Sequence, residues 1–235
     1  MEINLDLNLG GQTYSIAPQV VNAFLVVIFL STISVIIGIK AKKADFRSKP
    51  KGILLLAEIF VEAIQNLVDD TMGRGNRGFV PYIGTLALFL VCSNLTGLVG
   101  LQPPTSNYVV PMTLALITTL LIHINTIRFS GVKGFIGGFF DPMPILFPIN
   151  LVGALADPIS LSFRLFGNIL SGVIITTLLY QGLSGISMFI IPFIAPPFHA
   201  YFDIFSGVIQ TFVFIMLTMV NVGLAIGDRT EEVKN

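Results

Sequence analysis

The chain has 235 residues, of which 54% are hydrophobic and 11% are charged. An average soluble domain carries about 25% charged residues, so this composition excludes a water-soluble globular protein and predicts an integral membrane protein. The 13 Lys and Arg balance the 13 Asp and Glu, but none of the basic residues precedes Lys40, and this asymmetry can orient the chain in a bilayer.

The first predicted elements are a polar tail and one membrane span. Residues 1–19 are acidic and polar and lack the basic start of a signal peptide, so we expect them to remain as a tail on the mature protein. Residues 20–39 form an apolar run of about the length that crosses a bilayer. The basic stretch KAKKADFRSKPK follows at residues 40–51, and the positive-inside tendency places it in the cytoplasm and the tail outside.

Residues 53–70 have a different pattern. Glu58, Glu62 and Asp69 recur at helical spacing opposite a broad apolar face. Four carboxylates in this stretch make it a poor membrane span, so it is predicted as an amphipathic helix along the cytoplasmic surface.

Two more spans are expected next, one directed outward at residues 81–101 and one directed inward at residues 109–127. The prolines of LQPPTSNY turn the chain between them. The inward span ends at Arg128 and Lys133, so the charge rule is satisfied a second time.

The last two spans are too long to cross a bilayer upright. Residues 149–182 would reach about 51 Å as a straight helix, against a hydrocarbon core about 30 Å thick. Either Pro158 kinks this helix or the helix is strongly tilted. Residues 198–227 form the second long helix, and five crossings leave residues 228–235 in the cytoplasm. We therefore expect an all-α fold with a single membrane domain over residues 1–235.

Arg164 lies deep in the first long helix, where a charged side chain is costly and is functional by default. Ser160, Asn168 and Ser171 lie at helical spacing from it, so the four form one polar stripe. The alternative is that Arg164 pairs with an acid and only holds two helices together.

The last helix carries a second polar row, which includes His199, Asp203 and Gln210. Asp203 is expected in the outer half of the membrane, either lining a water-filled entry path or as a buried partner of Arg164. His199 could relay protons or could simply lie at the interface. Asp157, directly before Pro158, fits a helix start or a transport role.

The sequence lacks the patterns of soluble catalysis. It contains no phosphate-binding loop, metal-ligand cluster or nucleophile triad, so we expect no catalytic residue, cofactor, metal or nucleic-acid partner.

Three segments carry a resemblance to a known family. PISLSFRLFGN (residues 158–168), PPFHAYFDIFSGVIQTFVFIMLT near the end and NLTGLVGLQPPTSN (residues 94–107) closely resemble subunit a of the F-type ATP synthases. The resemblance implies an ion-translocating stator subunit with Arg164 as its essential arginine and Gln210 as the neighbour of that arginine. It also implies two offset half-channels that couple the flow of H⁺ or Na⁺ to rotation of a ring.

The partners implied by the resemblance are the c-ring of small hairpin subunits, the peripheral stalk subunit b, and the soluble ATPase sector, in a bacterial cell membrane.

The chain departs from the family at Val173, where an acidic or histidine side chain is common, so its outer path would depend on Asp203 and His199. A small secondary ion transporter is the alternative function, although the repeats and broken helices of such proteins are not evident. A structural scaffold leaves Arg164 and Asp203 unexplained.

Overall fold

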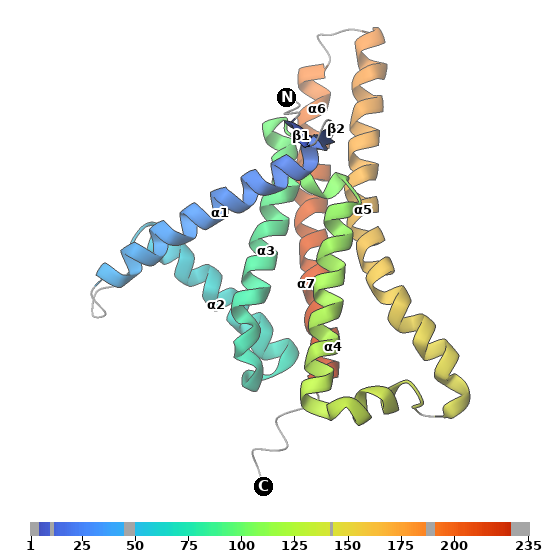
Figure 1. The fold of residues 1–235 in the computed structure, drawn as a ribbon. Coiled ribbons are helices and arrows are strands. Elements are labelled where there is room, and N and C mark those ends of the chain that lie inside the picture. Colours follow the sequence, from blue (N-terminus) through green and yellow to red (C-terminus); the bar gives the residue numbers. More distant parts are fainter. Residues whose placement is uncertain (1–4, 10–11, 45–49, 142, 187–190, 227–235) are drawn as a thin grey trace.

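The computed structural model of the chain describes residues 5–9, 12–44, 50–141, 143–186 and 191–226. Within them the chain is helical apart from one short hairpin (Figure 1). Five helical segments are long and apolar enough to cross a membrane: Pro18–Lys43, Arg74–Val99, Val109–Gly138, Pro144–Gly185 and Ile191–Leu224. The predicted all-α membrane fold with five spans is therefore confirmed.

The chain begins with the hairpin and one isolated helix. Strands β1 (Leu5–Leu9) and β2 (Gln12–Ile16) pair antiparallel within the segment predicted as a tail. Helix α1 (Pro18–Lys43) contacts the bundle mainly near its start, where the Asn22 amide donates to the Gln102 carbonyl oxygen at 2.9 Å. Most of the remaining side chains of α1 are exposed, so this helix faces lipid or a partner along most of its length.

Helix α2 (Ile53–Met72) is the predicted amphipathic helix. Its buried residues Ile64, Val68 and Met72 are four apart and face the bundle, whereas Glu58 and Glu62 are exposed. The short 3₁₀ segment η1 (Arg74–Phe79) connects it to α3 (Val80–Leu95).

The core lies between α2, α3, α4 (Val109–Gly138) and the last helix, α7 (Gly207–Ile226), and the long helix that follows α4 adds Leu161 and Leu165. Leu90, Phe214 and Met219 are fully buried there, and the Tyr82 hydroxyl lies 3.1 Å from the Thr118 hydroxyl. Helix α7 thus packs against α2, α3 and α4, whereas α1 lies outside this group, as Figure 1 shows.

Helix α4 changes direction near its end. Gly131 has a φ of 69°, which glycine adopts without a steric cost, and Figure 1 shows the remaining turns leaving the axis of the helix. The Asn150 amide donates to the carbonyl oxygens of Phe139 and Asp141, at 3.0 and 2.9 Å. These bonds connect the segment after Gly131 to the first turn of the next helix.

That next helix, α5 (Phe147–Ile186), has 40 residues and is longer than the expected residues 149–182. Pro158 lies inside it and cannot donate a bond to the carbonyl of Ala154. Figure 1 shows that α5 is bent rather than straight. The bend favours the kink over a tilted straight helix.

The final helical run begins earlier than the sequence suggested. It comprises α6 (Ile191–His199), the π-helical segment η5 (Ala200–Ser206) and α7, whereas a helix was expected only from residue 198. Pro196 and Pro197 lie within α6, and the wider π turn follows directly. The predicted tail at residues 228–235 lies outside the described residues.

Candidate functional site

The polar stripe of α5 divides between two environments. Ser160, Arg164 and Ser171 are exposed in the isolated chain, so they face lipid or a partner. Asn168 is half-buried because it turns toward η5, where its Oδ1 accepts a hydrogen bond from the Ser206 hydroxyl at 2.9 Å. The stripe therefore points outward from the bundle at Arg164 and inward at Asn168.

Arg164 forms no ion pair within the described part of the chain. This observation does not support the interpretation in which Arg164 pairs with an acid to hold two helices together. Its side chain instead lies at the edge of a cavity of about 360 Å³. We refer to this space as the lower cavity, because it lies toward the lower end of α5 in Figure 1.

The lower cavity is lined by polar groups from three helices. Asp157, Ser160 and Arg164 come from α5, whereas Thr119 and His123 come from α4 and Asn221 comes from α7. The interpretation of Asp157 as a helix start is wrong, because α5 begins ten residues earlier, at Phe147. No role was predicted for His123, although it shares this cavity with Arg164.

The spacing of Asp157, Ser160 and Arg164 was already a signal. Residues at i, i+3 and i+7 share one helix face, so the acid could have been placed with the arginine from the sequence. No comparable signal connects His123 to them, since only the packing of α4 on α5 brings it near.

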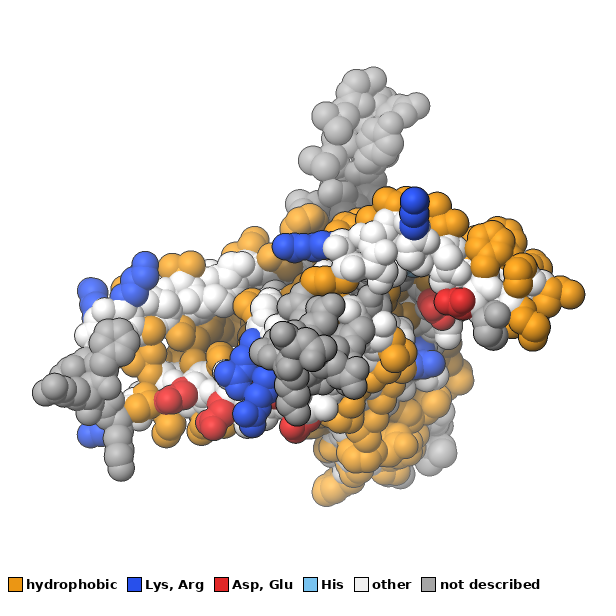
Figure 2. Space-filling model, turned by 90° about the horizontal axis from the view of Figure 1, so that it is seen from below, with side chains coloured by type: hydrophobic (Ala, Val, Ile, Leu, Met, Phe, Trp, Pro, Cys, Tyr) orange, Lys and Arg blue, Asp and Glu red, His pale blue; other side chains and the backbone are white. Residues whose placement is uncertain are grey.

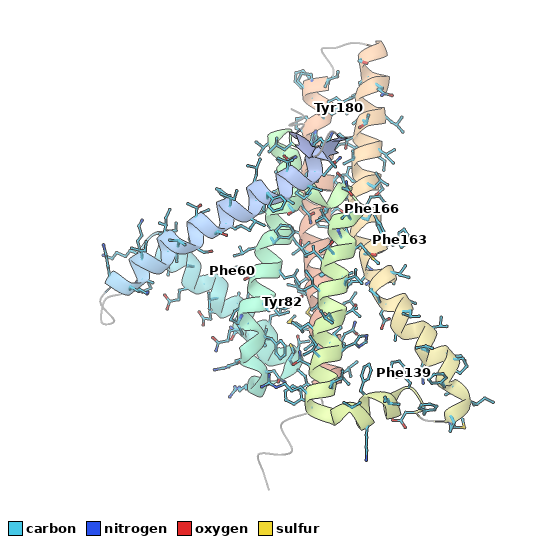
Figure 3. The ribbon with its side chains drawn as sticks, viewed as in Figure 1. Phe60, Tyr82, Phe139, Phe163, Phe166 and Tyr180 are labelled. Carbon is cyan, nitrogen blue, oxygen red and sulfur yellow. The ribbon has the colours of Figure 1, made fainter. Side chains whose placement is uncertain are left out.

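A second polar cluster surrounds Asp203 on η5. The Asp203 Oδ2 atom lies 2.6 Å from His199 Nδ1, and the Nε2 atom of the same ring lies 2.8 Å from the Tyr180 hydroxyl of α5. The Asp203 carboxyl also packs closely against Gly97. A Cβ atom at position 97 would lie only 3.2 Å from that carboxyl, so a glycine here leaves room for it. Tyr180 was missed, and Figure 3 shows it on the upper half of α5, beside α6.

Asp203 also borders a small cavity of about 10 Å³, the upper cavity, which is about the size needed for one water molecule. Asn94, Asn168 and Val173 share its lining. Val173 thus lines the same cavity as Asp203 and contributes no polar side-chain atom there.

Gln210 is buried in α7, with 8% of its surface exposed. Its amide nitrogen has no hydrogen-bond partner among the described residues. An unpaired buried donor costs about 1–3 kcal/mol, so this amide lowers the stability of the fold in the isolated chain.

The two cavities meet α5 one turn apart. Along this helix the lower cavity ends at Arg164 and the upper cavity begins at Asn168, a rise of about 6 Å. Arg164 and Asp203 border different cavities, and the described residues show no ion pair between them. The structure therefore gives no support to Asp203 as the buried partner of Arg164.

Comparisons with known proteins identify the family. The family model described as ATP synthase A chain matches residues 20–223. The chain belongs to this family. It is 36% identical to the sodium-ion-specific ATP synthase subunit a of Propionigenium modestum, over 95% of this chain and 79% of that protein. It is 33% identical to ATP synthase subunit a of Moorella thermoacetica, over 87% of this chain and 88% of that protein.

A third relative, ATP synthase subunit a of Mycoplasma pneumoniae, is 37% identical over 88% of this chain and 80% of its own length. The resemblance drawn from the sequence is therefore confirmed. The chain is a multi-pass membrane subunit with a role in the F-type ATP synthase, and it functions as part of a complex rather than as an enzyme on its own.

Proposed function

We propose that this subunit carries ions across the membrane through two half-channels and couples their flow to rotation of a c-ring. The lower cavity is the inner half-channel, and the cluster around Asp203 is the outer half-channel. The membership in the family makes a rotary function the first candidate, and the geometry of α5 supports its details.

The observation that carries the proposal is the position of Arg164 at the end of the lower cavity, one helical turn before the upper cavity begins at Asn168. Arginine carries the most strongly basic side chain, and the guanidinium of Arg164 has no carboxylate partner in the described chain. A ring carboxylate that arrives with its ion would meet this fixed positive charge, which favours the ionised carboxylate and therefore releases the ion. The same charge repels cations that would otherwise run directly between the half-channels.

The surface around Arg164 is suited to a moving partner. Gly167 and Ser171 are small and exposed on the same side of α5, so another helix can approach the backbone closely. Phe163 is also exposed, as are Val208 and Phe212 on α7. This surface combines apolar contact area with the charge of Arg164, which suits the outer helices of a ring of hairpin subunits.

The test is replacement of Arg164 in the whole complex, reconstituted in vesicles. Arg164→Ala should abolish ATP synthesis and allow a passive ion leak, because the barrier between the cavities is only one helical turn. Arg164→Lys should also synthesise poorly but leak less, because it keeps a charge while losing the planar guanidinium. ATP synthesis and passive ion flux are measured for each variant. Near-normal synthesis by Arg164→Ala would contradict the proposal.

Copurification separates this function from a secondary ion transporter. A rotary stator subunit should bring down the c-ring, subunit b and the soluble ATPase sector, whereas a transporter should purify without them.

The orientation that we propose places the N-terminus outside and the C-terminus in the cytoplasm of a bacterial cell. The ion is H⁺ or Na⁺ in this scheme.

A further inference from the structure

The Tyr180 hydroxyl is the outermost member of an unbroken row of polar groups. It lies 2.8 Å from His199 Nε2, and His199 Nδ1 lies 2.6 Å from Asp203 Oδ2. Three elements thus contribute one group each: Tyr180 from α5, His199 from the end of α6, and Asp203 from η5. We propose that Tyr180, His199 and Asp203 form a proton relay that delivers H⁺ from the outer surface. In this relay the Tyr180 hydroxyl holds the His199 ring in the orientation that faces Asp203.

Both nitrogens of the His199 ring are occupied, which matters for the ion. A neutral imidazole can donate from one nitrogen and accept at the other, and it binds a metal cation only through a free nitrogen lone pair. The hydroxyl and the carboxylate use both positions here, so the His199 ring connects the two groups and is arranged to pass protons between them. This inference rests on the proposed function and specifies the ion of its outer half-channel.

The surroundings of the relay contain few competing groups. The side of α3 that borders the upper cavity offers Asn94, and Gly97 contacts the Asp203 carboxyl. Asn168 is the polar neighbour from α5. None of these three titrates, and among the described side chains the one that hydrogen-bonds to the Asp203 carboxyl is His199, which can exchange a proton with it.

The transfer conserves atoms and charge. In the starting state His199 holds a proton on Nδ1, facing the Asp203 carboxylate, and Nε2 accepts from the Tyr180 hydroxyl. A proton from outer water binds the tyrosine oxygen as its original proton moves to Nε2, and the Nδ1 proton moves to Asp203 Oδ2. Asp203 is then neutral, and the net result is one proton moved inward.

The relay regains its starting state by turning of the imidazole ring after Asp203 has given up its proton. The His199 side chain is 30% exposed, which leaves room for this motion. The released proton continues by way of the upper cavity, where one water can connect Asp203 to the exposed side of α5.

The test compares Tyr180→Phe with Tyr201→Phe in the reconstituted complex. Tyr201 is a matched control, because it lies on η5 beside the relay but its hydroxyl forms no hydrogen bond among the described residues. Tyr180→Phe should slow proton-driven ATP synthesis about fivefold, the rate equivalent of one lost hydrogen bond. Tyr201→Phe should synthesise at the wild-type rate, and ATP hydrolysis by the soluble sector should confirm that each complex is assembled.

Two further measurements distinguish a relay from a packing role. In a His199→Ala background, Tyr180→Phe should cause no further loss, because the tyrosine acts through the histidine. Lowering the outer pH at constant total driving force should restore synthesis by Tyr180→Phe, since a slow uptake step speeds up with proton concentration. A misfolded variant would not recover in this way.

Wild-type synthesis by Tyr180→Phe, equal losses in Tyr180→Phe and Tyr201→Phe, or additive losses with His199→Ala would each overturn the relay. So would synthesis driven by a Na⁺ gradient alone at an unchanged rate in Tyr180→Phe. These outcomes leave the proposed function intact if Arg164→Ala still abolishes synthesis, so the two proposals can fail separately.

Discussion

Single residues carry most of the functional argument in this chain, and helical spacing in the sequence located many of them. Arg164, Ser160 and Asn168 were placed on one stripe by their spacing, and the structure keeps them on one side of α5 while turning Asn168 toward η5. Tyr180 could not be found in this way. It meets His199 only because α5 and α6 turn back on each other, and no local pattern encodes that meeting.

Asp203 gives the residue-scale prediction. Asp203→Asn keeps the size of the side chain but removes the group that accepts the proton from His199, so gradient-driven synthesis should fall by at least about tenfold. His199→Ala should have a smaller effect, because outer water can still reach the 19% exposed Asp203 side chain. Initial rates of ATP synthesis in vesicles measure both. An unchanged rate in Asp203→Asn would show that ions enter elsewhere.

At the scale of the elements, hydropathy located the five spans but placed their ends imperfectly. The length and the apolar composition of a span can be read from the local sequence without knowing the fold. Each predicted span therefore overlaps a helix. The start of α6 was missed because Pro196 and Pro197 usually mark a boundary, and here the helix passes through them before the π turn. The direction change at Gly131 was missed because a glycine alone does not specify a positive φ.

The connection between α2 and η1 gives the element-scale prediction. Arg77 donates from Nε to Asp69 Oδ1 at 2.9 Å, and this hydrogen bond is the main reason that the pKa of the Asp69 carboxyl is lowered from 3.8. The pair therefore stabilises the fold above the unfolded pKa, and this contribution is lost as the pH falls through the lower folded value. Arg77→Ala should unfold at a lower temperature than the parent at neutral pH.

The difference in melting temperature between Arg77→Ala and the parent should disappear in strong acid, where Asp69 is protonated in both proteins. High salt should also reduce it, because the Arg77 side chain is 51% exposed and the pair is screened. Thermal unfolding in detergent across a pH series measures the difference. A constant difference down to the lowest pH would mean that Arg77 acts through packing instead.

The charges of the whole molecule are unevenly distributed. Figure 2 shows the lower face, where Lys and Arg side chains gather beside Asp and Glu side chains. The basic residues of this end belong to the ends of α1 and α4 and to the segments around α2, whereas the loop between α3 and α4 at the opposite end carries no charge. The positive-inside tendency therefore predicts that the lower face is cytoplasmic.

Cysteine labelling tests this orientation. Val99 is 78% exposed at the end opposite the lower face, and Lys51 is exposed shortly before α2. In a Cys92→Ala background, Val99→Cys should react with an impermeant thiol reagent only from outside, and Lys51→Cys only from inside. Permeabilised membranes, in which both should react, provide the control. The opposite labelling would show that the chain has the reverse orientation in the membrane.

The single turn of α5 between the two cavities has an electrical consequence. Water in each cavity would carry the potential of its own side of the membrane into the protein, so the voltage would fall mostly across the roughly 6 Å between Arg164 and Asn168. A drop of 100 mV is worth about 2.3 kcal/mol for each elementary charge that crosses it. Concentrated over one turn rather than about 30 Å of bilayer, the field there would be about five times the average. In the proposed scheme, a charge that passes from the level of one cavity to the level of the other would cross that drop, so voltage could drive rotation as effectively as a difference in ion concentration.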